Sequence, residues 1–298
     1  MNCNFLNYFN GIIFVFIQFR NFDLLERKIL FLEWYNMIAL RSKEFLGKTT
    51  EQFSFGNYDI SMVKYHKPVS EDWHSHEKYH LSLVLQGGNL ESRKGKDIQI
   101  FPGSIVLYDK LEVHRNRHTA FPSENLNIEI DDSFFMKNEL STSDFRTSIL
   151  KDTVVQFQLL KIYKELKIDD ASSSDSIHSS LLTLFSGYNK MTDYKPIWVD
   201  TIRELLCDRW DEFITLKELS EKVQIHPVTI SRYFSKYFNC TLGEYMRRIK
   251  IEKAILFLKH TNKSLTEITF LCGFSDQSHF SKTFKLCTGF KPNEFRRI

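Results

Sequence analysis

The sequence predicts an α+β protein in which an N-terminal β-barrel, followed by helices, precedes an all-α C-terminal domain. Three observations support this fold class. Short alternating or apolar runs, separated by turn residues, fill residues 50–131. In the last third of the chain, a segment with helical spacing recurs after 49 to 50 residues. The 298 residues, of which 42% are hydrophobic and 26% charged, are enough for two domains with separate cores.

Composition excludes several classes of protein. With 11 Gly and 6 Pro, the chain is neither collagen-like nor of low complexity. Its five cysteines form no C-x-x-C pair, which argues against a disulfide framework or a Cys-type zinc site and favours a reducing cytoplasm. The apolar run 11–17 is too short to span a membrane, and Arg20 follows it, whereas a secretory signal has its basic residue first. We therefore expect a cytoplasmic protein with no membrane contact.

Residues 1–40 are interpreted as a leader of uncertain structure. Residues 1–19 carry no charged side chain, and Asn7, Asn10 and Gln18 interrupt their apolar sequence. The patterned sequence starts shortly after Met37. A second interpretation is therefore that translation begins at Met37.

Residues 41–133 are expected to form the β-barrel. Apolar or alternating runs predict its strands, and Gly87-Gly88-Asn89 and Pro102-Gly103 predict turns between them. Closely spaced short strands of this kind are typical of barrels and sandwiches. The expected strands are 58–65, 81–86, 97–101, 105–108 and 126–130.

Helices are expected in the next region, residues 134–188. Apolar spacing predicts one helix over 144–166 and another over 177–185, with the Ser-rich stretch 171–176 between them. Two interpretations remain open for these helices: a dimerisation interface, or packing on the barrel. The polar residues 189–195 are expected to link this region to the C-terminal domain, residues 196–298.

The repeat in the last third of the chain predicts two helix-turn-helix units. T-L-K-E-L-S-E-K-V at 215–223 corresponds to S-L-T-E-I-T-F-L-C at 264–272, and each segment opens with an S/T-x-x-E capping box. After a short turn, a second helix follows over 227–238 in one unit and 276–285 in the other. A third capping box, Thr241 with Glu244, predicts a long helix that connects the units and ends near Lys259.

Charge is concentrated on the C-terminal part of the chain. Residues 226–298 hold 13 Lys and Arg against 5 Asp and Glu, a net charge of +8, whereas the rest of the chain has a net charge of −5. A basic block behind an acidic body is typical of a phosphate-binding module. The alternative is an ordinary helical bundle with a duplicated hairpin.

The run from about Thr215 to Arg297 resembles the DNA-binding domain of the AraC/XylS transcription regulators. The resemblance rests on H-P-V-T-I-S-R-Y-F (226–234), C-T-L-G-E-Y-M-R-R-I-K (240–250), G-F-S-D-Q-S-H-F-S-K-T-F-K (273–285) and G-F-K-P-N-E-F-R-R (289–297). The sequence departs from the family pattern at Thr269, Cys272 and Lys282. The resemblance implies a homodimeric transcription regulator and not an enzyme. It would bind double-stranded promoter DNA and activate transcription through contact with RNA polymerase.

Helical geometry selects the residues that would touch DNA. Phe234 and Phe280 are expected to face inward, which turns the opposite face of each second helix outward. Arg232 can bind a guanine edge, Val228 a thymine methyl, and Gln277 an adenine. The family's base-reading positions fall at Val228, Ser231, Arg232, Gln277, Ser278 and Lys282. Lys236 and Lys285, further along the helices, are expected to contact phosphates.

Four histidines in the barrel are the candidate ligand-binding residues. His74-x-His76-x3-His80-x6-Gly87, with Phe101-Pro102-Gly103 and the later His114, resembles the cupin motif pair. His80 replaces the usual Glu, and Leu111 stands where a Gly is expected. The resemblance implies a cupin-like sensor domain that binds a small-molecule effector.

A second interpretation of the four histidines is a metal site. Imidazoles at His74, His76, His80 and His114 would suit zinc, iron or nickel if the barrel brings them together. Because the usual carboxylate is replaced, we predict no metal and no cofactor. The alternative functions are a cupin metalloenzyme with a helical appendage, and a structural DNA binder without a sensor.

Overall fold

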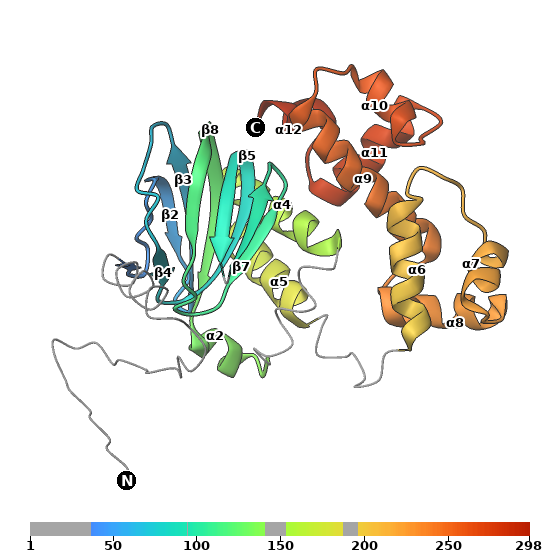
Figure 1. The fold of residues 1–298 in the computed structure, drawn as a ribbon, viewed down its shortest axis with the longest axis horizontal. Coiled ribbons are helices and arrows are strands. Elements are labelled where there is room, and N and C mark those ends of the chain that lie inside the picture. The colour runs from blue at the N-terminus through green and yellow to red at the C-terminus, as the bar shows by residue number, and fades with distance from the viewer. Residues whose placement is uncertain (1–36, 94, 141–152, 187–195) are drawn as a thin grey trace, which may run out of the picture.

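A computed structural model describes residues 37–93, 95–140, 153–186 and 196–298 (Figure 1). A β-sheet backed by helices forms the N-terminal part, and helices alone form the C-terminal part. Residues 1–36 of the predicted leader, residues 144–152 of the first predicted helix and the predicted linker 189–195 lie outside the described residues. Among the described residues, no helix has both the length and the apolar composition that a bilayer crossing needs.

The main sheet has six antiparallel strands in the described ranges. Its hydrogen-bonded order is β2-β3-β8-β5-β6, and β7 also pairs with β5. A second, parallel pair consists of β1 (Ile38–Leu40) and β4 (His74–His76). The six strands are β2 (Lys48–Ser54), β3 (Tyr58–Tyr65), β5 (Tyr79–Arg93), β6 (Lys96–Ile100), β7 (Ile105–Tyr108) and β8 (Arg115–Ile130).

The structure does not confirm the predicted cupin-like barrel. In the described residues, the hydrogen-bonded path of the main sheet starts at β2 and ends at β6 without closing. The β1–β4 pair meets the main sheet at the start of β8, where the backbones of His74 and His114 exchange two hydrogen bonds. What is established is a mixed fold with an N-terminal sheet and a C-terminal helical domain.

The predicted turn at Gly87-Gly88-Asn89 is wrong, because β5 continues through it. The pairing of β5 with β8 shifts register on both sides of Gly88, so the glycines form bulges within one long strand. Gly88 has φ of +123°, and a Cβ there would lie 2.2 Å from the carbonyl oxygen of Ile100 on β6. Only glycine fits at this approach of two backbones.

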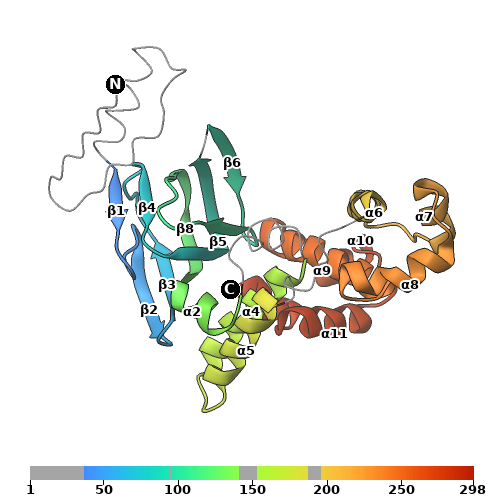
Figure 2. The same ribbon diagram turned by 90° about the horizontal axis from the view of Figure 1, so that it is seen from below.

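Alternating side chains of the sheet face two different environments. On β5, Leu81, Leu83 and Leu85 pack against the helices that cover one face of the sheet, whereas His80 and Ser82 face a cavity on the other. The covering helices are α2 (Asp132–Lys137), α4 (Thr153–Ile168) and α5 (Ser173–Ser186) (Figure 2). Helix α5 begins within the Ser-rich stretch. Two hydrogen bonds stabilise its start: the Asp170 N–H donates to the Ser173 hydroxyl at 3.0 Å, and the Ser172 N–H donates to the Asp170 carboxylate at 2.9 Å.

Helices alone make up the described residues of the C-terminal domain. All three predicted capping boxes are confirmed, at Thr215, Thr241 and Ser264. The turns within the two helix-turn-helix units pass through left-handed residues, Gln224 with φ of 55° and Gly273 with φ of 66°. The helices are α6 (Ile197–Asp208), α7 (Leu216–Val223), α8 (Pro227–Phe238), α9 (Leu242–His260), α10 (Leu265–Leu271), α11 (Gln277–Thr288) and α12 (Pro292–Arg297).

The two helix-turn-helix units belong to different hydrophobic cores. Helices α7 and α8 share a core with α6 and the first half of α9. Helices α10 and α11 share one with the second half of α9, with α4 and with the sheet. Helix α4 thus contacts both α9 and α11 (Figure 2). Ile255 of α9 is fully buried in this core, whereas the neighbouring Leu256 is 39% exposed.

Candidate functional site

The first candidate site is the exposed face of α8. His226 caps the helix through Nδ1, which accepts a hydrogen bond of 3.3 Å from the Val228 N–H, and Pro227 occupies the first turn. Phe234 and Phe238 stack in the core with ring centroids 4.1 Å apart. Their burial turns the opposite face to solvent. There the predicted DNA contacts Val228, Ser231, Arg232 and Lys236 are all exposed.

Helix α11 presents a corresponding face in the second unit. Asp276 caps it by accepting a hydrogen bond of 2.7 Å from the His279 N–H. Phe280 and Phe284 are fully buried in the core that α11 shares with α9 and α10. Of the remaining predicted DNA contacts, Gln277, Ser278 and Lys285 are exposed. Lys282 is exposed as well.

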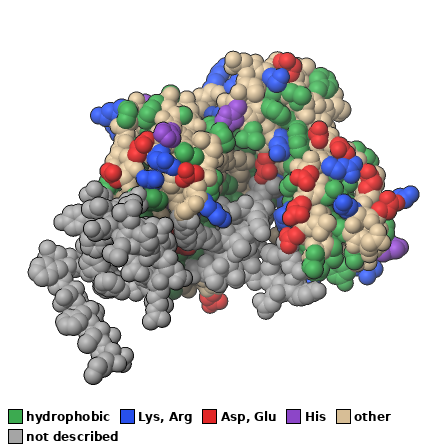
Figure 3. Space-filling model, in the orientation of Figure 1, with side chains coloured by type: hydrophobic (Ala, Val, Ile, Leu, Met, Phe, Trp, Pro, Cys, Tyr) green, Lys and Arg blue, Asp and Glu red, His purple; other side chains and the backbone are tan. Residues whose placement is uncertain are grey.

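Helix α11 lies away from the mixed-charge face of the domain. On the face shown in Figure 3, acidic and basic side chains are interspersed where α6 and α7 lie. Helix α11 lies behind α9 in Figure 1 and on the far side from α6 in Figure 2. The exposed residues of α11 are therefore separated from the acidic groups of α6 and α7.

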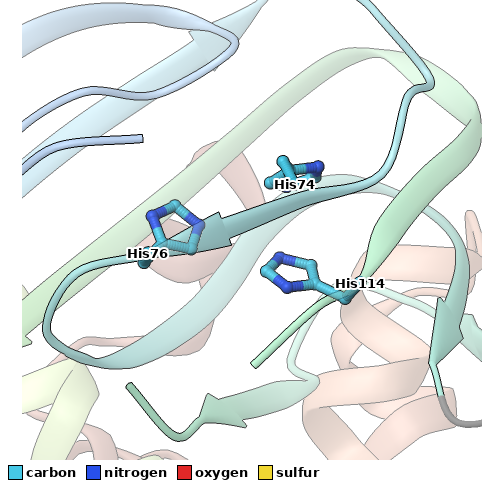
Figure 4. A group of neighbouring side chains, drawn as sticks. All are labelled: His74, His76 and His114. Atoms are coloured by element: carbon cyan, nitrogen blue, oxygen red, sulfur yellow. The ribbon is translucent and has the colours of Figure 1, made fainter. Parts of the chain in front are cut away.

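The second candidate site is a buried histidine cluster in the sheet domain. His74 and His76 come from β4 and His114 from the residue before β8 (Figure 4), and His80 comes from β5. All four side chains are buried. One ring nitrogen from each of His74, His76 and His114 lies within 4.8 Å of the others. The ring centroids of His76 and His80 are 4.3 Å apart, so the structure brings all four predicted residues together.

Hydrogen bonds fix how two of these rings are oriented. His74 Nδ1 lies 3.1 Å from the carbonyl oxygen of Asp72, and His114 Nδ1 lies 3.0 Å from that of Glu112. A carbonyl oxygen only accepts, so both Nδ1 atoms carry the proton and both Nε2 atoms are free to act as ligands. His80 differs, because its Nε2 lies 3.1 Å from Oδ1 of Asn127.

Burial keeps the histidines neutral. Desolvation is the largest cause that lowers the pKa of His74, His76 and His114, and it lowers the pKa of His80 to about 4. Around the rings is a cavity of about 30 Å³, which has room for about two water molecules. Among the described residues, its lining includes Tyr65, Tyr108, Glu91 and four asparagines, and no Lys or Arg.

Several polar groups of the cavity lack a hydrogen-bond partner among the described residues. They include His76 Nδ1, His80 Nδ1, Asn125 Oδ1 and Asn127 Nδ2. Unpaired buried polar groups are costly, so these atoms need a polar partner in the cavity, which water or a bound ligand can supply. The sequence did not predict these asparagines as cavity residues. The signal for them was the alternation of Asn125, Asn127 and Glu129 with apolar residues along β8.

Glu91 is a second residue that the sequence analysis missed. Its carboxylate lines the cavity but already accepts a hydrogen bond of 2.6 Å from the Tyr108 hydroxyl and pairs with Arg93 Nε at 2.8 Å. The Tyr108 ring in turn stacks on His114 with centroids 3.8 Å apart. A carboxylate thus lies close to the histidines, although not at the position of His80.

Comparison with known proteins places the first site in a family. A family described as a helix-turn-helix domain matches residues 219–298. The chain is 32% identical over 109 residues to the bifunctional transcriptional activator/DNA repair enzyme AdaA of Bacillus subtilis, covering 37% of this chain and 51% of that protein. It is 29% identical over 244 residues to the HTH-type transcriptional activator RhaS of an Enterobacter species, covering 75% of this chain and 87% of that protein.

Solved structures also match the chain. The C-terminal domain of AraT, a response regulator from Geobacillus stearothermophilus, is 27% identical, with 36% of this chain and 88% of that one covered at a TM-score of 0.32. A structure of ToxT from Vibrio cholerae is 14% identical, with 81% and 98% covered at a TM-score of 0.35. Coverage differs among the relatives, and the chain spans about half the length of AdaA.

Proposed function

We propose that this chain, which belongs to the AraC/XylS family of transcription regulators, binds promoter DNA at specific sequences and activates transcription there. The observation that carries the proposal is the pair of capped helix-turn-helix units whose second helices expose polar and basic residues. The family match covers both second helices. RhaS, which aligns over most of its length, is named a transcriptional activator.

Helices α8 and α11 would enter successive major grooves on one face of the duplex, which lie about 34 Å apart. Helix α9, of 19 residues and about 28 Å, connects the two units rigidly. Arg232 would read guanine, Val228 the thymine methyl and Gln277 adenine. Ser231, Ser278 and Lys282 complete the base-reading set. Lys236 and Lys285 would bind phosphates and so position the protein without reading sequence.

The N-terminal region would act as the sensor. We assign residues 41–133 to a cupin-like sensor domain, 134–188 to a helical region that dimerises, 189–195 to a linker and 196–298 to DNA binding. The cavity at His74, His76, His80 and His114 is the proposed effector site, because its buried polar groups need a partner. An effector that binds two arrangements of the domains with different affinity would change DNA binding.

The remaining partners follow from this function. We propose that the chain acts in the cytoplasm and activates transcription through contact with RNA polymerase. A homodimer would double the length of DNA that is recognised. We propose no catalytic activity, since the chain spans only about half of AdaA, the relative whose name includes an enzyme.

The test is a selection of bound sequences from random duplex DNA with the full chain, followed by salt titration on the selected sequence. We expect a motif with two sub-sites about one helical turn apart. Binding that shows no enriched motif and falls with salt equally on all sequences would reject sequence-specific regulation.

A further inference from the structure

The histidine cavity has the size of an ion site. Its volume of about 30 Å³ is far below the roughly 300–1,000 Å³ of pockets that enclose organic ligands. An ion with one water molecule fits this space. Among the described residues no Lys or Arg lines the cavity, and the guanidinium of Arg93, which lies over the Tyr108 ring, is paired with the carboxylates of Glu91 and Glu112.

The geometry of three histidines suits one metal ion. The nearest ring nitrogens of His74, His76 and His114 lie within 4.8 Å of one another. Ligand nitrogens of a tetrahedral ion with bonds of about 2.0–2.1 Å lie roughly 3.4 Å apart. Binding of an ion would therefore require the ring nitrogens to approach one another, and His76, whose Nδ1 has no hydrogen-bond partner among the described residues, is the ring least constrained by hydrogen bonds. Figure 4 shows the three rings gathered around one space, two from β4 and one from the start of β8.

The surroundings of the rings have the features of metal ligands. The Nδ1–H groups of His74 and His114 are held by backbone carbonyls, which leaves Nε2 unprotonated. The prediction of no metal rested on the replaced carboxylate. Three imidazoles with an open fourth position are, however, enough to bind zinc, as in catalytic zinc sites.

We propose that His74, His76 and His114 bind one divalent transition-metal ion of the zinc, cobalt or nickel type, and that this ion is the effector of the DNA-binding domain. Imidazole ligands select these ions over Mg²⁺ and Ca²⁺, which need oxygen ligands. The regulatory part of this inference rests on the proposed function. The binding part does not.

A short path of contacts connects the site to α9. Tyr108 stacks on His114 and ends β7, and Val106 on the same strand lines the cavity. The segment just before β7 touches the C-terminal domain. There the Phe101 ring meets the His260 ring edge-on at 5.7 Å, and a Cβ on Gly103 would lie 3.3 Å from Ile255. When the three rings close on an ion, β7 shifts against α9, and this changes how the two helix-turn-helix units are held.

The binding test uses the full chain after treatment with a chelator. Titration with Co²⁺ should give visible absorption bands that saturate at one ion per chain and disappear when Zn²⁺ is added, while Mg²⁺ has no effect. X-ray absorption of the zinc-loaded protein should show nitrogen neighbours at about 2.0 Å. This measurement needs no variant, so a misfolded mutant cannot obscure it. Absence of saturable Co²⁺ and Zn²⁺ binding would overturn the proposal.

Variants identify the ligands. H76N and H114N should each weaken Co²⁺ binding at least tenfold. H178Q is the matched control, since His178 lies on α5 against Tyr58 and outside the cavity. Equal affinity of H76N, H114N and the control would overturn the ligand assignment. Folding of each variant is checked by its melting temperature without metal.

The regulatory test measures DNA affinity with and without one equivalent of Zn²⁺. We expect the Kd for the selected sequence to change fivefold or more in the wild type and not in H114N. Metal binding without a change in Kd would overturn the role as effector. Specific DNA binding without metal binding would overturn the metal site and leave the proposed function intact, whereas metal binding without specific DNA binding would reject the proposed function alone.

Discussion

Leu111 holds a left-handed backbone conformation, with φ of 57°, between β7 and β8. A Cβ in this conformation costs roughly 1–2 kcal/mol, and the side chain is 63% exposed, so it recovers little by burial. The turn is needed at the histidine site, because the Leu111 N–H donates a 2.8 Å hydrogen bond to the carbonyl of His76. A Gly is expected at this position of the cupin motif, and the left-handed backbone gives the reason.

Leu111→Gly is therefore expected to raise the free energy of unfolding by about 1 kcal/mol, measured by urea denaturation. Leu111→Val, which places a β-branched residue in the same conformation, should lower it by a similar amount. A less stable Gly variant would show that the turn is not strained.

In the proposed DNA complex, Arg232 reads a base and Lys236 binds a phosphate. Both are exposed on α8, but Arg232 lies nearer the N-terminal half that would enter the groove. Arg232→Ala should cost about 1–3 kcal/mol and relax specificity at one position of the selected sequence. Lys236→Ala should weaken all sequences equally and reduce the salt slope by about 1. Fluorescence anisotropy on single-base variants of the site distinguishes the two results, and uniform weakening by Arg232→Ala would make it a phosphate contact.

Glu129 gives the sheet domain a pH dependence. Burial, the largest cause, raises its pKa to about 7, although the Lys43 N–H donates a 2.7 Å hydrogen bond to it. Between the unfolded value of about 4.5 and 7, the folded state holds the extra proton, so stability falls as pH rises through this window. The cost is complete above pH 7.

Glu129→Gln should thus raise the free energy of unfolding at pH 8 by about 1–3 kcal/mol and leave it unchanged at pH 4. Denaturation curves of both proteins at several pH values check this. A constant difference at all pH values would mean that the substitution acts through packing and not through charge.

Among the elements, those that begin with a local signal were predicted best. Thr215, Thr241 and Ser264 each accept a hydrogen bond from the N–H of the Glu three residues on, as the capping pattern predicts. The strands were predicted only where their sequence is apolar. Strand β8 begins at Arg115, but its first half is polar because it pairs with β5 away from the core, where Arg117 bonds to Ser92 and Asp97. Side-chain periodicity carries no information on such a pairing.

The cap of α9 should matter to both helix-turn-helix units, because α9 contributes to both cores. Thr241→Ala removes the acceptor for the Glu244 N–H and should lower the free energy of unfolding by about 1 kcal/mol. Thr241→Ser keeps the hydroxyl and should stay within a few tenths of a kcal/mol of the wild type. If the Ser variant lost as much as the Ala variant, the Thr methyl group and not the cap would stabilise α9.

At the scale of the whole molecule, the two units differ in what holds them. The unit of α10 and α11 is docked on α4, where the Lys164 ammonium donates to the Gly289 carbonyl and lies 5.7 Å from the Phe290 ring centroid. The unit of α7 and α8 shares its core with α6 and α9 in the described residues. The sequence patterns within each domain are compatible with domains that dock on each other and with domains that do not. Only the structure shows which residues of α9 contact the sheet domain. Among the described residues, the second unit is therefore the one that packs directly on the sheet domain.

Neighbouring residues on α9 provide the test of this docking. Ile255 is fully buried beside Gly103, whereas Leu256 is 39% exposed. A charge at Ile255 would have to leave the interface or remain unsolvated, so Ile255→Asp should separate the domains. We expect a larger radius of gyration by small-angle X-ray scattering and faster amide exchange in α4 and α11, with α8 still protected.

Leu256→Asp is the matched control, with the same new charge one residue away, and should change neither measurement. Circular dichroism separates undocking from unfolding, since the helical signal is expected to persist in both variants. If Ile255→Asp kept the wild-type radius of gyration, or if Leu256→Asp increased it equally, the contact between α4 and α9 would not hold the domains together. The path from the histidine site to the DNA-binding helices would then have to pass through another part of the chain.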